Sequence, residues 1–396
     1  MKVLLVTGRF PQRSETFIYR KAVALANHGH EVTVLTRHRG EWELYPDPLP
    51  ATLRVEQLPP DLSRGSPTSA ARAVVGLARH AGAAARLRAL WRLAGHDPRM
   101  FARHLPFVAR EADVVHFEFL GLAAMYPFVG ELMQTRTITS CRGQDVHLLA
   151  IRSVAERAPL IACLLGSGAL HCVSQELATT VTRITRRREG IWINRPAVDV
   201  AKIAMRSPDP RSSPLRILSS GRLVWVKGYD YLLRAFAILA ARGVAFRADI
   251  LGDGELYSPL RFSIADLGLQ DRVFLAGGVA PADVLTRLAT TDVFVLSSLE
   301  EGISNAVLEA MAAGVPVVTT KAGGMAEAVT DGIEGFMVPI REATALADRI
   351  EQLARSPERR CEMGQAARRR AVAEFSLERQ VARFEQIYLD VAAAPR

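Results

Sequence analysis

Residues 293–320 read VFVLSSLEEGISNAVLEAMAAGVPVVTT, and this stretch decides the fold. The apolar residues 293–298 predict a buried strand, and residues 305–313 predict a helix that Gly314 ends. The apolar run 315–320 then predicts another strand. Strand, helix and strand within so few residues are typical of a parallel sheet covered by helices. We therefore expect an α/β protein.

The same alternation of strands and helices continues on both sides of this stretch and is interrupted once. Residues 199–214 are polar and contain three prolines, a composition typical of a linker. We expect an amino-terminal domain of residues 1–198 and a carboxyl-terminal domain of residues 215–375. Residues 376–396 form a last helix that packs back across the boundary. Both domains are expected to be doubly wound, Rossmann-like sheets that face each other across a cleft.

Composition narrows the class of protein. Apolar residues make up 49% and charged residues 23% of the chain, a mixture that is typical of globular domains with large cores. The net charge of +9 favours acidic partners, which include nucleic acid, anionic lipid and sugar nucleotides. Because no known nucleic-acid-binding module or aromatic stacking platform accompanies the charge, we expect no nucleic-acid partner.

Two observations bear on where the protein works. The first apolar run, residues 3–6, is too short for a signal peptide, and Pro159 and two glycines interrupt the longest one, residues 158–170. We therefore expect a cytoplasmic protein. The four cysteines form no Cys-x-x-Cys pair and no histidine cluster joins them, so we expect no metal site and no cofactor.

The loop between the strand 293–298 and its helix predicts an anion site. Gly302, Ile303, Ser304 and Asn305 lie at the start of the helix, where backbone N–H groups are free to bind a phosphate. Glu309 follows one turn later, where it can accept hydrogen bonds from vicinal hydroxyls. Taken alone, Glu309 is as readily explained as a solvated helix residue.

A second loop carries two cations. Gly221 and Arg222 end the strand 215–220, and Lys227 precedes the next helix. An arginine fork and a lysine point charge together suit a diphosphate, although two surface cations are ordinary in a basic protein. Gly252 and Gly254 follow the strand 246–251 and permit close backbone approach, which any tight turn also uses.

Together these residues resemble a known family. The segments GR at 221–222, KG at 227–228, GDG at 252–254 and EGISNAVLEAMAAGVPVV at 301–318 are similar to the retaining glycosyltransferases of family 4, which have the GT-B fold. The resemblance covers the carboxyl half. The SETFI run at 14–18 is similar to the branch that builds bacterial exopolysaccharides such as colanic acid.

The resemblance implies a role for each matching residue. Arg222 and Lys227 would hold the diphosphate of a nucleoside-diphosphate sugar, Glu309 its ribose, and Glu301 the transferred sugar near the reacting carbon. It also implies a retaining reaction without a stable covalent intermediate. Because the chain has no Asp-x-Asp motif to hold a divalent ion, we expect transfer without a metal. The acceptor is expected to be a glycan or a lipid-linked glycan.

The amino-terminal half is less clear. Ser14 and Glu15 stand where the family more often has a glycine-rich loop, and Ser14 is either a phosphate-binding residue or an ordinary N-cap. Arg142, Gly143 and Asp145 occupy a loop in which many relatives carry a sugar-contacting histidine before the glycine. Arg142 replaces that histidine, so the role does not transfer, and a phosphate or a carboxylated sugar is an alternative partner.

Residues 64–92 contain arginines but no acidic residue, in a helical stretch rich in alanine and leucine. Such a basic amphipathic segment is typical of peripheral contact with an anionic membrane, here the inner face of the bacterial membrane. A solvated face of a packed helix explains it equally well. Two other functions remain open for the whole chain, a non-catalytic sugar-nucleotide sensor or scaffold and a GT-B epimerase.

Overall fold

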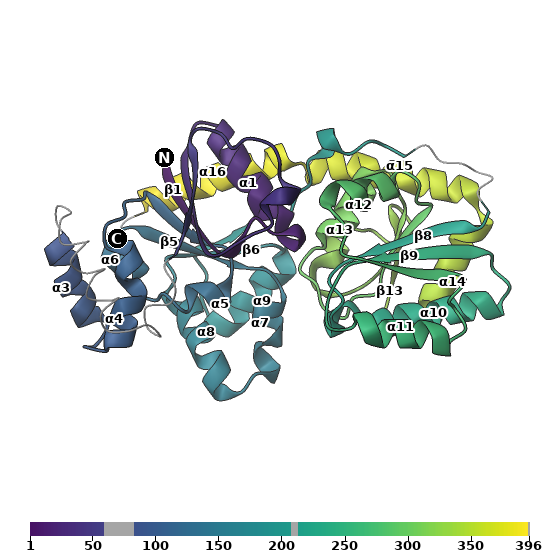
Figure 1. Ribbon diagram of the computed structural model, residues 1–396, viewed down its shortest axis with the longest axis horizontal. Coiled ribbons are helices and arrows are strands. Elements are labelled where there is room, and N and C mark those ends of the chain that lie inside the picture. Colours follow the sequence, from purple (N-terminus) through teal and green to yellow (C-terminus); the bar gives the residue numbers. More distant parts are fainter. Residues whose placement is uncertain (59–82, 207–212, 395–396) are drawn as a thin grey trace. The chain divides into compact units, whose positions relative to one another are not determined.

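The computed structural model describes residues 1–58, 83–206 and 213–394. The chain forms two compact units, shown in Figure 1. Unit 1 comprises Met1–Cys172, Ala178–Asn194 and Val381–Arg396, and unit 2 comprises Val173–Leu177 and Arg195–Gln380. The border thus falls at Asn194, a few residues before the expected linker. Each unit is a parallel sheet with helices on both faces, so the predicted α/β class is confirmed.

Unit 2 contains a sheet of six parallel strands in the order β10-β9-β8-β11-β12-β13. The chain runs outward from β8 through β9 to β10 and then returns to the other side of β8. Ligands in such sheets bind beyond the carboxyl ends of the strands at this reversal. The strands are β8 (Leu215–Ser220), β9 (Phe246–Leu251), β10 (Val273–Gly277), β11 (Val293–Leu296), β12 (Val317–Thr320) and β13 (Gly335–Val338).

Two layers of helices bury the faces of this sheet. Phe236, Leu239 and Ile350 belong to the core under one layer, and Leu308, Met311 and Ala367 to the core under the other. The first layer consists of α10 (Tyr229–Ala241), α11 (Tyr257–Asp266) and α14 (Ala343–Arg355), and the second of α12 (Pro281–Leu288), α13 (Asn305–Ala312) and α15 (Pro357–Glu374). Because both faces are covered, the strands are mostly buried, and the central strand β11 (VFVL) is apolar throughout.

Unit 1 contains a sheet of seven parallel strands in the order β3-β2-β1-β4-β5-β6-β7. These are β1 (Lys2–Phe10), β2 (Glu31–Arg39), β3 (Leu53–Gln57), β4 (Val114–Phe117), β5 (Arg136–Cys141), β6 (Ala169–Cys172) and β7 (Ile191–Ile193). Its described helices are α1 (Thr16–Asn27), α3 (Ala83–Leu93), α4 (Pro98–His104), α5 (Leu120–Ala123), α6 (Val129–Met133), α7 (Gln144–His147), α8 (Val154–Gly166) and, from Ala178 onward, α9 (Gln175–Thr185).

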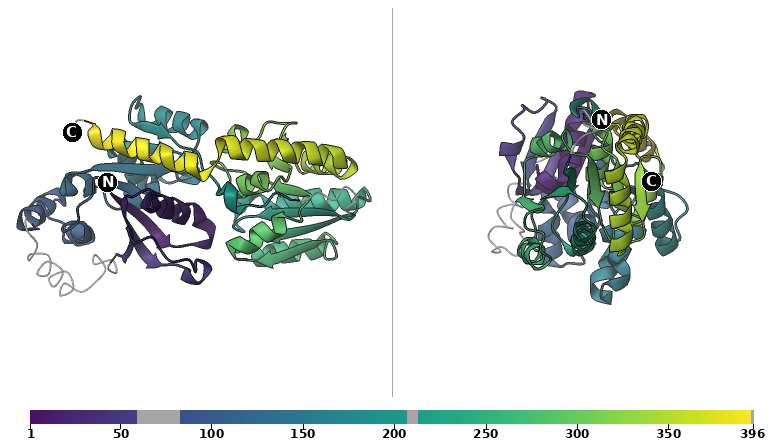
Figure 2. Two further views of the ribbon diagram at one scale, coloured as in Figure 1. Left: turned by 90° about the horizontal axis from the view of Figure 1, so that it is seen from above. Right: turned by 90° about the vertical axis from the view of Figure 1, so that its right-hand side faces the viewer.

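The last helix, α16 (Leu377–Ala393), belongs to unit 1 from Val381 onward. Figure 2 shows it as the helix that follows α15 at the end of the chain. Its Glu385 bonds His28 Nδ1 at 3.0 Å and His30 Nε2 at 2.9 Å, and Tyr388 bonds a buried histidine of β4. In the described part of the chain, no helix is long and apolar enough to cross a membrane.

One local expectation was wrong, and one strand was missed. Ser14 does not cap α1, because Arg13–Glu15 form a separate 3-10 turn and the helix starts at Thr16, with Glu15 before it and no capping side chain. The 3-10 turn leads the chain into the helix, with the N–H of Glu15 bonded to the carbonyl of Gln12 at 3.0 Å. A sequence pattern for an N-cap does not reveal such a turn. The strand β3, Leu53–Gln57, was not expected, because LRVEQ is short and half polar.

Two buried histidines of unit 1 are held neutral. Burial lowers the pKa of His104 to about 4, and burial, reinforced by the charge of Arg142, lowers the pKa of His171 to about 3. The neutral ring of His104 has both nitrogens engaged: Nδ1 bonds the carbonyl of Met100 at 2.8 Å, and Nε2 accepts the N–H of Phe128 at 3.4 Å.

We expect unit 1 to lose stability in acid. A histidine with a folded pKa below its unfolded value near 6.5 binds protons preferentially in the unfolded chain, so stability falls as the pH drops below that value. From pH 7 to pH 5, His104 and His171 should each cost about 2 kcal/mol. All nine histidines precede residue 172 and lie outside unit 2, which makes unit 2 an internal control. Amide hydrogen exchange at the two pH values measures the stability of each unit. Equal losses of stability in the two units would contradict the prediction.

Candidate functional site

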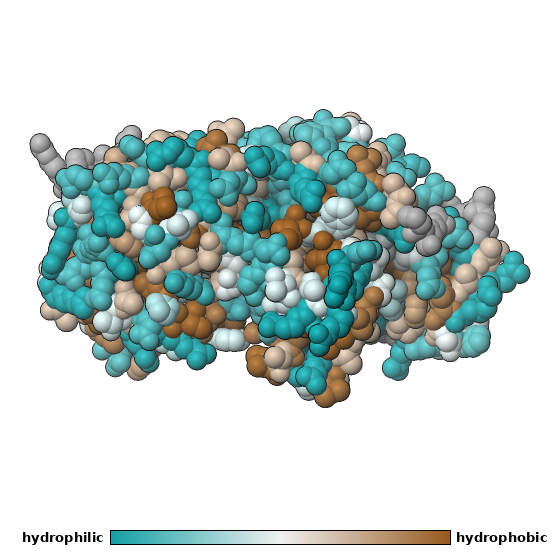
Figure 3. Space-filling model, turned by 180° about the vertical axis from the view of Figure 1, so that it is seen from behind, coloured by the Kyte–Doolittle hydropathy of each residue, from teal (hydrophilic) through white to brown (hydrophobic). Residues whose placement is uncertain are grey.

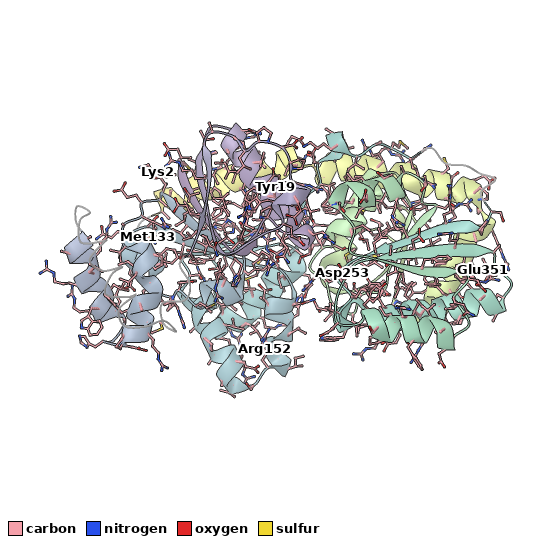
Figure 4. The ribbon with its side chains drawn as sticks, in the orientation of Figure 1. Lys2, Tyr19, Met133, Arg152, Asp253 and Glu351 are labelled. Atoms are coloured by element: carbon pink, nitrogen blue, oxygen red, sulfur yellow. The ribbon has the colours of Figure 1, made fainter. Side chains whose placement is uncertain are left out.

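Four loops of unit 2 follow the carboxyl ends of β8, β9, β11 and β12, and backbone contacts join them. The N–H of Leu223 donates to the carbonyl of Asp253 at 2.8 Å, and the N–H of Leu299 donates to the carbonyl of Val226 at 2.7 Å. Figure 4 labels Asp253 in the loop after β9. The loops therefore form one continuous surface over the reversal point of the sheet.

The glycines allow this close approach. A β-carbon on Gly252 would lie 1.9 Å from the carbonyl oxygen of Gly221, and one on Gly254 would lie 2.4 Å from that of Leu223. Likewise, a β-carbon on Gly323 would lie 1.8 Å from the carbonyl oxygen of Glu301. No side chain fits at these positions without displacing a neighbouring loop. Gly252 and Gly254 thus fix the loop that carries the cations.

Lys227 and Glu301 meet in the middle of this surface. The Lys227 ammonium donates to Glu301 Oε1, and the Ser298 hydroxyl donates to the same oxygen at 2.8 Å. The two charged side chains are 13% and 12% exposed, so they are mostly buried yet still open to a ligand. The Ser297 hydroxyl also donates to the carbonyl of Lys227 at 3.0 Å, which ties the end of β11 to the cation loop.

Tyr229, which the sequence did not single out, supports the cation loop from within the core. Its hydroxyl donates to the carbonyl of Gly221 at 3.1 Å, and the side chain is fully buried. Burial, with the charge of Glu301, raises the pKa of this phenol well above its usual value, so it stays a protonated donor. Arg222 differs from all of these because it is exposed to solvent at the rim of the loop.

The start of α13 lies beside the Lys227–Glu301 pair. Gly302, Ile303 and Ser304 are buried, and Ser304 occupies the N-cap position without a side-chain capping bond. The N–H of Ser304 donates to the sulfur of Met325 at 3.4 Å, which is a weak acceptor. Glu309 is half-buried in the second turn of the helix. The positive end of the α13 dipole is therefore available to an anion.

The expected residues of unit 1 form a different arrangement. Ser14 is exposed in its 3-10 turn and its hydroxyl accepts a bond from Gln12 at 3.1 Å, while Glu15 is half-buried. Asp145 Oδ1 accepts the N–H groups of Arg142 at 2.9 Å and Gly143 at 3.0 Å. Asp145 therefore shapes the turn after β5.

Arg142 is committed to an internal ion pair. Its Nε donates to the carbonyl of Glu118 at 2.8 Å, its Nη2 donates to the carboxylate of Glu118, and its guanidinium lies 4.2 Å from the ring centre of Phe17. Lys21 bonds the same fully buried carboxylate, and the two cations hold the pKa of Glu118 below its usual value against the opposing effect of burial. Glu118 and Lys21 are missing from the sequence prediction, because they are distant in the chain.

A chain of buried polar groups continues from this cluster. His116 bonds Ser140 at 2.8 Å, Ser140 bonds His171 at 2.8 Å, and His171 bonds the carbonyl of Asn194 at 2.9 Å. Tyr388 bonds the other nitrogen of His116 at 2.8 Å. These buried groups satisfy one another's hydrogen-bonding capacity. In the described ranges, no three His, Cys, Asp or Glu side chains are placed to hold a metal ion.

Comparison with known proteins identifies the family. The family model "Glycosyl transferases group 1" matches residues 202–370. The putative colanic acid biosynthesis glycosyltransferase WcaL of Salmonella typhimurium is 30% identical over 378 residues, which cover 90% of this chain and 91% of WcaL. The chain belongs to the group 1 glycosyltransferases. The amylovoran biosynthesis glycosyltransferase AmsK of Erwinia amylovora is 26% identical over 404 residues, 95% of this chain and 96% of AmsK.

Solved glycosyltransferase structures share the fold along the whole chain. HepE of Anabaena, solved in complex with UDP-glucose, matches with a TM-score of 0.74 at 20% identity and covers 100% of both chains. The sucrose-phosphate synthase of Thermosynechococcus elongatus matches with a TM-score of 0.75 at 18% identity, again over 100% of both chains. The fold of this glycosyltransferase is GT-B, as the resemblance implied.

Proposed function

We propose that unit 2 binds a nucleoside-diphosphate sugar and that the enzyme transfers this sugar, with retention, to a glycan or lipid-linked glycan of a bacterial surface polysaccharide. The observation that carries the proposal is the Lys227–Glu301 pair at the start of α13, over the reversal point of the sheet. The polysaccharide acceptor is supported by the names of the relatives WcaL and AmsK. The UDP-glucose bound to HepE supports a sugar-nucleotide donor, and UDP-sugars are the first donors to test.

The chemistry follows from where charge develops. Departure of a nucleoside diphosphate leaves positive character on the sugar carbon and negative charge on the phosphate. Lys227 and the N–H groups at the start of α13 stabilise the phosphate, and fixed donors of this kind lower the barrier most effectively. The guanidinium of the exposed Arg222 can donate two hydrogen bonds to the same diphosphate. Glu301 accepts hydroxyls of the transferred sugar, and Glu309 accepts those of the ribose.

Two other functions fit the same ligand. A sensor or scaffold would bind the sugar nucleotide without consuming it, and an epimerase would rearrange the sugar without an acceptor. Both Glu301 and Lys227 are present and in contact, which favours catalysis. Release of nucleoside diphosphate on mixing donor and acceptor separates the three, because only the transferase needs both. Retention is tested by the anomeric configuration of the product in a proton NMR spectrum.

Removing either member of the pair should abolish transfer. We expect Lys227→Ala and Glu301→Ala each to lower the rate of nucleoside diphosphate release by roughly 10²–10³-fold, the usual loss for a charge-stabilising group. Lys321→Ala is the matched control, because this lysine is exposed in the neighbouring loop after β12. Melting temperatures show whether each variant is folded. Full activity in both site variants would exclude the proposed site.

We also propose that transfer needs no divalent cation, because Lys227 and the helix start supply the positive charge that a metal would otherwise provide. The rate in EDTA should then equal the rate in magnesium or manganese. The assay uses purified enzyme stripped of metal and saturating donor. Activity that disappears in EDTA and returns with either cation would show that a metal ion takes part in the transfer.

Peripheral membrane contact through residues 64–92 remains a proposal. Of this segment, residues 64–82 lie outside the described residues, but α3 carries Arg88, Trp91 and Arg92 on its exposed side. Arg88→Gln with Arg92→Gln should weaken binding to phosphatidylglycerol vesicles at least fivefold, since each cation near an anionic surface contributes about 1 kcal/mol. Unchanged vesicle binding would show that α3 is an ordinary solvated helix.

A further inference from the structure

Helix α8 of unit 1 exposes an apolar face to solvent. Ile151, which ends the turn before α8, is 73% exposed, Val154 is 68% exposed and Leu165 is 54% exposed. Ala155, Ala158 and Ala162 are exposed between them. Positions 154, 155, 158, 162 and 165 fall on one side of a helix, so these residues form a continuous stripe. Figure 3 shows hydrophobic side chains at the lowest edge of the molecule, the edge to which the α8 region extends in Figure 1.

The exposure belongs to a firmly held helix. Leu160 and Leu164 are buried on the opposite side of α8. Ser153 and Glu156 form a capping box at its start. At its end, Arg187 donates to the carbonyls of Leu164 at 3.2 Å and Ser167 at 2.7 Å. Because both ends are satisfied and one side is packed, the apolar stripe is a fixed surface.

Arginines stand at both ends of the stripe. Arg152, labelled in Figure 4, and Arg157 lie at the start of α8. Arg187 holds the far end, and its neighbours Arg186 and Arg188 are exposed there. Residues 151–166 and 186–189 contain five arginines and two glutamates, and one of these, Glu156, is engaged in the capping box. The surface is therefore apolar in the middle and positive at its ends.

We propose that this α8 surface docks on an anionic lipid membrane. An apolar helix face with arginines around it matches the interface of an anionic bilayer, where alkyl groups enter the headgroup boundary and cations meet lipid phosphates. A second copy of the chain fits less well, since a two-fold contact would press the arginines of both copies together. The proposal is independent of the donor chemistry of unit 2 and of residues 64–92.

The test measures binding of the full chain to vesicles by co-sedimentation. Vesicles of phosphatidylglycerol and phosphatidylethanolamine in equal parts should bind the protein, and vesicles of phosphatidylcholine alone should bind it weakly. Ile151→Ser with Val154→Ser and Leu165→Ser should lower the partition coefficient about tenfold or more, because these alkyl groups lose their burial. Arg186→Gln with Arg188→Gln should lower it at least fivefold, and only on the anionic vesicles.

A matched control lies on α11, where Arg261 and 73%-exposed Phe262 stand side by side in unit 2. Arg261→Gln with Phe262→Ser should bind vesicles like the wild type. The proposal is overturned if the wild type ignores anionic vesicles or if the triple serine variant binds them equally well. It is also overturned if the chain is a dimer that this variant dissociates without any change in vesicle binding. The shift in melting temperature on adding UDP tests the proposed donor site separately. If UDP causes no shift, the donor proposal fails, and the vesicle result still stands.

Discussion

Backbone oxygens occupy the space that β-carbons would need at Gly252 and Gly323, and the donor site depends on this contact. It brings the loops after β9 and β12 against those after β8 and β11, at distances that no side chain permits. The loops of Lys227 and Glu301 meet in the same way, because a β-carbon on Gly228 would lie 2.3 Å from the carbonyl oxygen of Ser297. The charges are thus fixed by backbone packing, and a fixed charge stabilises a transition state better than one that must reorganise.

Each unit pairs cations with a carboxylate near the carboxyl ends of its strands, but the surroundings differ. In unit 1, Arg142 and Lys21 share the fully buried carboxylate of Glu118, and neutral histidines and Tyr388 complete the cluster. A buried carboxylate with two cations is costly to disturb, because removing one partner leaves an uncompensated charge. In unit 2, Lys227 and Glu301 keep 13% and 12% exposure. Of the two carboxylates, Glu301 is the more open to solvent, since Glu118 is fully buried.

Much of the fold was predictable because its pattern is local. The strands 215–220 and 246–251 were expected with the bounds that the structure has, because each is a short run that a glycine follows. The nearness of Glu301 to Lys227 also followed from sequence, because neighbouring strands of a parallel sheet end at one edge. The pairing of Arg142 with Glu118 did not, since it depends on side-chain packing across β4 and β5. Nothing in the local sequence distinguishes a cation with an internal partner from one that awaits a ligand.

The pair in unit 2 also constrains how a donor is recognised. The ammonium of Lys227 and the hydroxyl of Ser298 both donate to one oxygen of Glu301. A phosphate that draws Lys227 away leaves this mostly buried carboxylate short of a donor, and an unsatisfied charge in such a place is unfavourable. Hydroxyls of a bound sugar can replace the lost ammonium, whereas a nucleoside diphosphate without its sugar cannot. If the pair binds the donor as proposed, the site would favour the intact sugar nucleotide over the nucleoside diphosphate that is left after transfer.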